Sequence, residues 1–216
     1  MDVVIVCYVP ELAQGTQMRD IAGTVRKAID TKCRLHGTVP KFTVITKRDR
    51  AATMIALTAT ATILAQPRRR AIVYYYGHGD QVRDKNGDEA DGMDEVWTTQ
   101  GIVDDEISAV FSKIHDTSRL YLLSDSCSSG SMIDLTLNAR PWVTIGSTND
   151  AQDALATFDG GAFTLWGLLP ALADPRNYTP TDLYKRISAA LGISTQTCTI
   201  LSGNKTILNE PMFGSL

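Results

Sequence analysis

Short apolar runs separated by helical patterns are the feature that most constrains the fold of this chain. Residues 71–76 (AIVYYY) and 120–123 (LYLL) are continuous apolar runs with the length of a strand buried on both faces. Other segments, such as 18–33, repeat apolar residues every three to four positions, which is the spacing of one helix face. Strands that alternate with helices in this way predict a mostly parallel sheet flanked by helices.

The same patterns place the individual elements along the chain. We expect strands at 3–9, 42–46, 71–76, 120–124, 142–146 and 197–201, and helices at 18–33, 50–65, 104–115, 163–172 and 181–191. The 216 residues, of which 44% are hydrophobic, are enough for one sizeable core in one domain. The polar stretch 80–101 is too long for a simple connection, so we expect a functional loop there.

Two of the predicted strands end at side chains that can carry out catalysis. His78 lies between Gly77 and Gly79 after one strand, and Cys127 lies in the small-residue segment 125–130 after the next. Each has an ordinary interpretation, since cysteines are often buried as small apolar side chains and a histidine at a strand end is often a satisfied polar group. Open α/β sheets, however, bind ligands at the carboxyl ends of their strands, and a cysteine nucleophile needs a histidine base.

The glycine after the histidine has a physical role in this interpretation. Because Gly79 has no Cβ, a substrate carbonyl can approach its backbone closely. The backbone N–H groups of Gly79 and Cys127 would then point at one position and form an oxyanion hole. The sequence therefore predicts His78 and Cys127 as a catalytic pair with these two donors beside it.

The overall composition excludes several functions. The net charge of −3 argues against a general nucleic-acid-binding surface, and the basic run 68–70 is expected to be a solvated loop before a strand. The four cysteines lack the paired spacing of metal ligands, which is typical of a reducing compartment. No apolar run approaches the length of a membrane span, and no leader segment is recognisable. We therefore expect a cytoplasmic protein without a membrane partner.

Five segments together resemble the metacaspases, which are caspase-like cysteine proteases. They occur in the order of the family and cover nearly the whole chain: 75–81 (YYGHGDQ), 91–95 (DGMDE), 102–107 (IVDDEI), 125–131 (DSCSSGS) and 160–164 (GGAFT). The resemblance implies an α/β caspase-like fold with a mostly parallel six-stranded central sheet. It also implies one catalytic domain over 1–216, with a large-subunit-like part at 1–137 and a small-subunit-like part at 138–216. Cys127 corresponds to the family's nucleophile and His78 to its general base.

Metacaspases cut after arginine or lysine, and the resemblance implies that carboxylates of this chain bind that basic side chain. Asp125, two residues before the cysteine, and Asp20, near the start of the first helix, match the family's pocket aspartates. The chain departs from the family at Gln17, where cysteine is usual, and at Tyr76, where serine is usual. These differences change the expected shape of the pocket but not its negative charge. Tyr76 is expected to be one of the residues that bind the substrate. The alternatives are an ordinary exposed helix residue for Asp20 and a turn former for Asp125.

A second acidic group matches the family's calcium site. The corresponding residues are Asp94, Asp104, Asp105 and Asp134. Calcium favours several carboxylate oxygens, and binding would order the polar stretch beside the catalytic pair. The alternative is that two of these aspartates only cap the helix predicted at 104–115. Residues 84–95 also imitate an EF-hand loop, but Glu89 occupies the position where the turn needs glycine, so we expect a polar surface loop instead.

The sequence and the resemblance together predict a calcium-stimulated cysteine endopeptidase that cleaves after arginine or lysine. Its partners would be protein or peptide substrates, with neither nucleic acid nor membrane, and it would act as a monomer. Two alternatives remain open. One is a caspase-fold protease of different specificity, and the other is a catalytically weak regulatory scaffold with the same fold.

Overall fold

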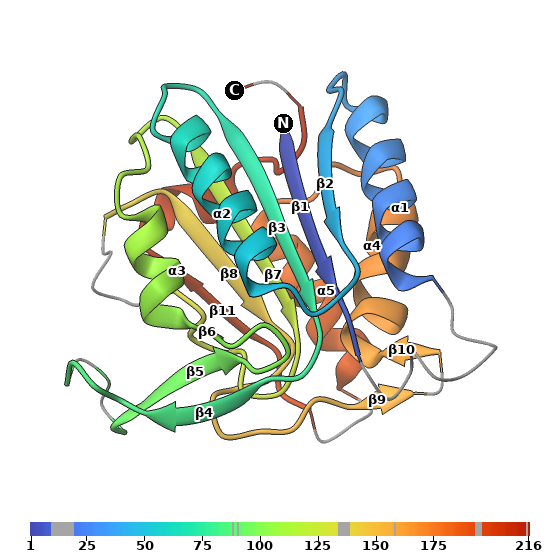
Figure 1. Ribbon diagram of the computed structural model, residues 1–216. Coiled ribbons are helices and arrows are strands. Elements are labelled where there is room, and N and C mark those ends of the chain that lie inside the picture. Colours follow the sequence, from blue (N-terminus) through green and yellow to red (C-terminus); the bar gives the residue numbers. More distant parts are fainter. Residues whose placement is uncertain are drawn as a thin grey trace.

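A six-stranded sheet forms the centre of the molecule (Figure 1). The computed structural model describes residues 1–9, 20–87, 89, 91–133, 139–157, 159–192, 196–214 and 216. The strands of the sheet lie in the order β11-β8-β7-β3-β1-β2. Their bounds are β1 (Asp2–Cys7), β2 (Lys41–Ile45), β3 (Arg70–Tyr76), β7 (Arg119–Asp125), β8 (Trp142–Gly146) and β11 (Thr199–Ser202).

Five of the six strands run parallel, as the alternation of strands and helices predicted. β1 pairs with both β2 and β3, β3 pairs with β7, and β7 pairs with β8, all in parallel, while β11 pairs antiparallel with β8 at one edge. The chain first moves outward from β1 to β2 and then returns to the other side of β1 with β3. This reversal creates a switch point, where open α/β sheets form their ligand crevices.

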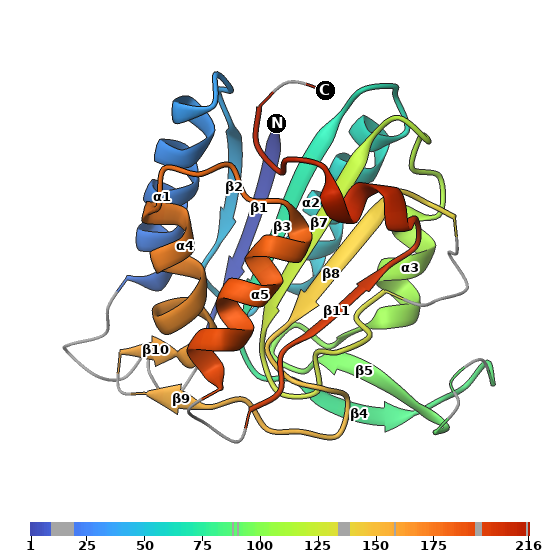
Figure 2. The ribbon, with the colours of Figure 1, turned by 180° about the vertical axis from the view of Figure 1, so that it is seen from behind.

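Helices cover both faces of the sheet, and the pleat divides the core between them (Figures 1 and 2). Alternate β1 residues Val3 and Ile5 belong to the core on one face, whereas Val4 and Val6 belong to the core on the other. The first face is covered by α1 (Ile21–Leu35), α4 (Leu169–Ala173) and α5 (Pro180–Leu191), and the second by α2 (Arg50–Leu64) and α3 (Asp104–Phe111).

Local signals in the sequence set several helix boundaries. Asp20 and Asp49 cap α1 and α2, accepting hydrogen bonds from the backbone N–H groups of Gly23 at 2.8 Å and Ala52 at 2.9 Å. Thr179 caps α5 in the same way. The helix predicted at 163–172 begins instead as a π-helix, Phe163–Leu168, and continues as α4. A 3₁₀ helix at Lys205–Asn209 follows the last strand.

The polar stretch 80–101 was expected to be a loop, and that expectation is wrong. It contains β4 (Asp80–Arg83) and β5 (Met93–Trp97), which pair antiparallel, and β5 also pairs with β6 (Ile102–Val103). The many charged residues of the segment obscure these strands in the sequence, because β5 buries Asp94 and Glu95 beside the apolar Val96 and Trp97. No helix pair brackets residues 84–95 in the described part of the chain, which excludes an EF-hand there.

The basic run also differs from expectation. Arg70 is the first residue of β3, and only 7% of its surface is exposed, so the run 68–70 is not simply a solvated loop. A second small hairpin, β9 (Ala156–Thr157) and β10 (Gly160–Gly161), lies near the carboxyl ends of the parallel strands (Figure 1). Among the described residues, no helix combines the length and the apolar character that crossing a membrane requires.

Candidate active site

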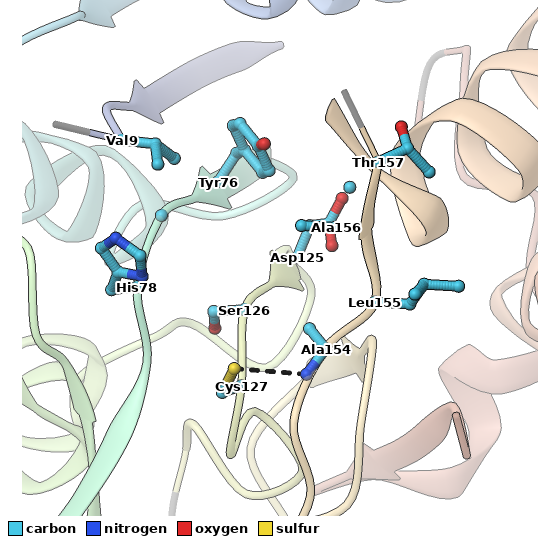
Figure 3. A pocket seen from close by; sticks show the side chains of 12 residues that line it. Val9, Tyr76, His78, Asp125, Ser126, Cys127, Ala154, Leu155, Ala156 and Thr157 are labelled. Carbon is cyan, nitrogen blue, oxygen red and sulfur yellow. Dashed lines mark hydrogen bonds between the residues drawn. The ribbon is translucent and has the colours of Figure 1, made fainter. Parts of the chain in front are cut away.

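The carboxyl ends of β1, β3 and β7 meet at a cavity of about 260 Å³ (Figure 3). Both members of the predicted catalytic pair, His78 and Cys127, contribute to its wall. The other lining residues are Val9, Tyr76, Gly77, Asp125, Ser126, Ala154, Leu155, Ala156, Thr157 and Gly161. Side chains that lie far apart in the sequence are therefore brought together where the sequence predicted an active site.

Cys127 is the half-buried cysteine of the chain, and its sulfur is held at the cavity wall. The backbone N–H of Ala154 donates a hydrogen bond to Sγ over 3.2 Å (Figure 3). Burial raises the pKa of the Cys127 thiol, and the nearby Asp153 carboxylate raises it further, whereas the Ala154 N–H lowers it. The loop before β9 thus places both a donor and a carboxylate beside the sulfur.

The other three cysteines are buried free thiols and are not among the described residues that line this cavity. Burial raises the pKa of Cys7 and Cys198 to about 12 and that of Cys33 to about 11. A thiol with so high a pKa is almost entirely protonated near neutral pH and is a poor nucleophile. Cys127 is consequently the one of the four whose position suits catalysis.

The backbone of His78 is held by two side chains that the sequence analysis missed. The Tyr75 hydroxyl donates a hydrogen bond to the His78 carbonyl over 2.7 Å, and the His78 N–H donates to Thr99 Oγ1 over 3.0 Å. The Tyr75 ring stacks on Trp97, with ring centroids 4.3 Å apart. Thr99 gave no signal in the sequence, because it lies 21 residues beyond His78 and only the fold brings the two together.

Hydrogen bonds continue from this aromatic pair to the strand that carries the cysteine. The Trp97 indole N–H donates to Ser124 Oγ over 3.2 Å, and the Ser124 and Ser126 hydroxyls are 3.0 Å apart. All three side chains are buried. β5 is thereby linked both to the backbone of His78 and to the residues just before Cys127.

Gly79 lies in close contact with the backbone of the cysteine. A Cβ added to Gly79 would stand 2.0 Å from the carbonyl oxygen of Cys127, so no residue with a side chain fits there without a shift of the backbone. The predicted oxyanion donors, Gly79 and Cys127, are therefore neighbours in space. Ser128, which follows the cysteine, has a φ of 44°, a left-handed conformation that turns the chain sharply after the nucleophile.

Asp125 is a buried carboxylate in the wall of the cavity. Its Oδ2 accepts hydrogen bonds from the Thr164 N–H at 3.0 Å and the Thr164 hydroxyl at 2.6 Å. Burial raises the pKa of Asp125 to about 6, and these two hydrogen bonds oppose the rise. Gly161 faces this carboxylate, since an added Cβ would stand 2.1 Å from Oδ2. Tyr76, which was also predicted as a pocket residue, is the last residue of β3 and lines the cavity as well.

Asp20 occupies a different position from Asp125. It is exposed, caps α1, and is not among the described residues that line the cavity. Its charge nevertheless acts on Cys7 together with that of Asp125, since both carboxylates raise the pKa of that thiol after the larger effect of burial. Asp20 and Asp125 therefore both lie near the carboxyl end of β1.

The acidic residues are partly brought together at the base of the β4–β5 hairpin. Oxygen atoms of Glu89, Glu95 and Asp104 lie within 4.8 Å of one another. Asp104 was predicted as a metal ligand, and the two glutamates were not. Of the other predicted ligands, Asp105 accepts a hydrogen bond from Asn86 at 2.7 Å, and Asp94 is buried on β5 beside Glu95. Asp134 lies outside the described residues.

A further carboxylate, that of Asp150, adds negative charge to this region. Burial raises the pKa of both Glu95 and Asp150, and the Asp150 charge contributes to the rise at Glu95. Ser131 donates to Glu95, yet the buried Oδ1 of Asp150 has no hydrogen-bond partner among the described residues. Buried carboxylates with an unsatisfied oxygen fit a hard cation such as calcium, which prefers oxygen ligands.

Comparison with known proteins identifies the family. The sequence profile described as "Metacaspase, peptidase C14 domain" matches residues 24–136, which is more than half of the chain. The chain belongs to the metacaspase family. The match spans the segments that hold His78, Cys127 and the β4–β5 hairpin, whereas Asp20 and the cavity residues from Ala154 onward lie outside it.

Curated metacaspases match parts of the chain. Metacaspase-1 of Saccharomyces cerevisiae strain YJM789 is 45% identical over 78 residues, which is 33% of this chain and 18% of the yeast protein. Metacaspase-1 of Eremothecium gossypii is 36% identical over 125 residues, which is 50% of this chain and 27% of that protein. The matched region thus spans only about a fifth to a quarter of these relatives.

Solved structures support the fold of this metacaspase chain. A crystal structure of a protein from Geobacter sulfurreducens matches with a TM-score of 0.72 and 19% identity, covering 100% of this chain and 99% of the other. Caspase-1 from Spodoptera frugiperda matches with a TM-score of 0.63 and 12% identity, over 94% and 85% of the two chains. The predicted caspase-like α/β fold is confirmed.

The raised pKa of Asp125 predicts a pH-dependent cost to stability. Its folded pKa of about 6 exceeds the ordinary value of 3.8, so the folded state binds this proton more tightly than the unfolded state does. The free energy of unfolding therefore falls as the pH rises through about 6. We expect Asp125→Asn to be more stable than wild type at pH 8, by roughly 1–3 kcal/mol, and to lose this advantage near pH 4.

Denaturant unfolding at the two pH values checks this prediction. Asp116→Asn is a suitable control, because the Asp116 side chain is 83% exposed and the change should have little effect at either pH. An equal stability difference between wild type and Asp125→Asn at pH 4 and pH 8 would show that ionisation of this carboxyl is not what costs stability.

Proposed function

We propose that this chain is a calcium-stimulated cysteine endopeptidase that cleaves after arginine or lysine. The observation that carries the proposal is the cavity that joins Cys127, His78 and the buried carboxylate of Asp125. A nucleophile, a base and a negatively charged recognition group thereby face one space. Family membership supports the reaction class, and the residues present supply each chemical role.

The reaction follows from the positions of these groups. The Cys127 thiol gives its proton to the His78 imidazole, and the sulfur attacks the scissile carbonyl carbon. The resulting oxyanion accepts hydrogen bonds from the backbone N–H groups of Gly79 and Cys127. Imidazolium then protonates the leaving amine as the C–N bond breaks, which leaves a thioester. His78 next takes a proton from water, the hydroxyl attacks the thioester, and the product acid leaves as the thiol is restored.

The cavity walls favour a long basic side chain. Val9, Tyr76 and Leu155 supply apolar surface along which the methylene stem of arginine or lysine can pack. The carboxylate of Asp125 in the cavity wall pairs with a guanidinium or an ammonium, and such a partner favours its ionised form. The exposed Asp20 adds negative charge at the same end of the sheet.

Calcium would act through the hairpin rather than in the chemical step itself. Glu89, Glu95 and Asp104 are the described residues whose oxygens would hold the ion, and the ion would neutralise their mutual repulsion. Glu95 lies on β5, the strand that also carries Trp97, which contacts Tyr75 beside His78. If calcium orders β5, it would thereby position His78. We infer that this is how calcium stimulates cleavage.

Cleavage of fluorogenic peptides tests the proposed activity. We expect turnover of peptides with arginine or lysine before the cut, and no more than about 1% of this rate for peptides with aspartate or asparagine there, because a carboxylate lines the cavity. Cys127→Ala should abolish turnover, while Cys198→Ala, which changes a buried thiol outside the cavity, should retain it. Faster cleavage of acidic peptides would favour a caspase-fold protease of other specificity.

Covalent labelling separates an enzyme from a regulatory scaffold. A peptide electrophile that ends in arginine should acylate or alkylate Cys127 in the wild-type protein with calcium present. Lack of both turnover and labelling across basic, acidic and asparagine-ended peptides would favour the scaffold.

The calcium dependence is tested by titration. Asp104→Asn and Glu95→Gln should each raise the calcium concentration that gives half-maximal activity, by about tenfold or more, since each removes one charge from the ligand group. Asp116→Asn, at an exposed position, is the matched control and should leave the midpoint unchanged. Full activity in chelator would remove the calcium component and leave the protease intact.

The support of His78 gives a prediction about Thr99. Thr99→Val keeps the size of the side chain and removes the oxygen that accepts from the His78 N–H. We expect kcat to fall by about tenfold with little change in KM, because the base is displaced while the substrate pocket stays intact. Thr99→Ser should restore activity, and Thr58→Val, on the exposed face of α2, should have no effect. A change confined to KM would contradict this positioning role.

A further inference from the structure

A hollow at the opposite end of the sheet is built around three consecutive arginines. It measures about 400 Å³ and lies where the parallel strands begin, near both ends of the chain in Figure 1. The residues that line it are Met1, Asp2, Gly37, Thr38, Val39, Arg68, Arg69, Arg70, Gly214 and Leu216. The seven residues of β3 separate it from the catalytic cavity, a distance of about 20 Å at the rise of an extended strand.

Arg70 is a buried charge whose hydrogen-bonding capacity is only partly used. Only 7% of its surface is exposed, and Nη1 donates to the Gly214 carbonyl over 2.6 Å, while the buried Nε has no partner among the described residues. Burial lowers the pKa of Arg70, which reports the cost of keeping this charge away from water. The nearby carboxylate of Glu210 is occupied by Arg119, at 2.7 and 2.9 Å.

The three arginines of the run form no ion pair in the described part of the chain. None of the ion pairs found there involves Arg68, Arg69 or Arg70. Burying a positive charge is costly unless an anion compensates it. The hollow therefore combines a buried guanidinium that forms no ion pair, and that the charge of Glu210 compensates only in part, with two exposed guanidinium groups beside it.

Hydrogen bonds fix the backbone of the run, which defines where its three side chains leave the main chain. The N–H of Arg68 donates to Thr117 Oγ1 and that of Arg69 to Ser118 Oγ, each over 3.0 Å. The carbonyl of Arg69 accepts from the N–H of Arg119 at 2.8 Å. Preorganised donors lose less conformational freedom when a ligand binds.

We propose that this hollow binds a phosphate-bearing anion, with pyrophosphate or a longer polyphosphate group as its core. The planar guanidinium donates two parallel hydrogen bonds to phosphate, and three such groups match an anion with several charges. A volume of 400 Å³ is within the range of small-molecule sites. Asp2 supplies the one carboxylate side chain among the described lining residues, and it opposes anion binding. This site is independent of the peptidase activity.

Calorimetry with sodium pyrophosphate, in calcium-free buffer of fixed ionic strength, tests the proposal directly. We expect saturable binding with a stoichiometry of one, together with a rise in Tm that follows ligand concentration, because a ligand of the native state stabilises it. ATP without magnesium is the second probe and should compete with pyrophosphate for the same site. Failure of both to bind at millimolar concentration, or binding of ATP without competition, would overturn the proposal.

Paired variants identify the location. Arg68→Ala and Arg69→Ala change exposed side chains, and each should weaken pyrophosphate binding by about tenfold without loss of folding. Arg48→Ala, at an exposed position between β2 and α2, is the matched control and should bind as wild type does. Asp2→Asn should tighten binding. Equal weakening by Arg48→Ala would indicate only a general response to charge, and unchanged binding by Asp2→Asn would show that the ligand does not lie in this hollow; either result would overturn the site.

Discussion

The parallel register of β3 against its two neighbours is the constraint on which the catalytic arrangement depends. Tyr76 is paired with Cys7 on β1 and with Asp125 on β7. His78 and Cys127 each lie two residues beyond the paired positions Tyr76 and Asp125, so the two strands bring these side chains to the same end of the sheet. A slip of one residue would exchange the faces of an entire strand and separate the pair. The buried apolar side chains on both faces of the sheet prevent such a slip.

The sequence predicted the central sheet well because its signals are local. The run of β7 is continuously apolar from Leu120 to Leu123, and that of β8 is apolar except for Thr144. The observed limits of β7 differ from the predicted ones by one residue at each end, and those of β8 agree with them. α2 begins at Arg50 as predicted, after its cap Asp49, whereas α1 begins at Ile21, three residues later than predicted, because Asp20 caps it. His78 and Cys127 could be recognised for the same reason, since each stands directly after an obvious strand.

The parts that could not be predicted depend on contacts between distant segments. The β4–β5 hairpin consists largely of polar residues, and its strands are defined by pairing with each other and by the burial of Trp97 against the main sheet. Thr99 and Asp150 have no distinctive neighbours in the sequence, so only the fold shows that one supports the histidine and the other adds charge beside Glu95. The burial of Arg70 could not be predicted from the sequence, because Arg70 follows two exposed arginines and looks like part of the same basic run.

The pleat of β3 sends the side chains of the consecutive residues Tyr75 and Tyr76 to opposite faces of the sheet. Tyr75 belongs to the core on the α2 side and holds the histidine backbone, whereas Tyr76 belongs to the opposite core and borders the cavity. Adjacent positions in one strand thus serve separate tasks on separate faces. A substitution at Tyr76 can therefore change the wall of the cavity without removing the hydrogen bond that Tyr75 donates to the His78 carbonyl, so these two features can vary independently among related chains.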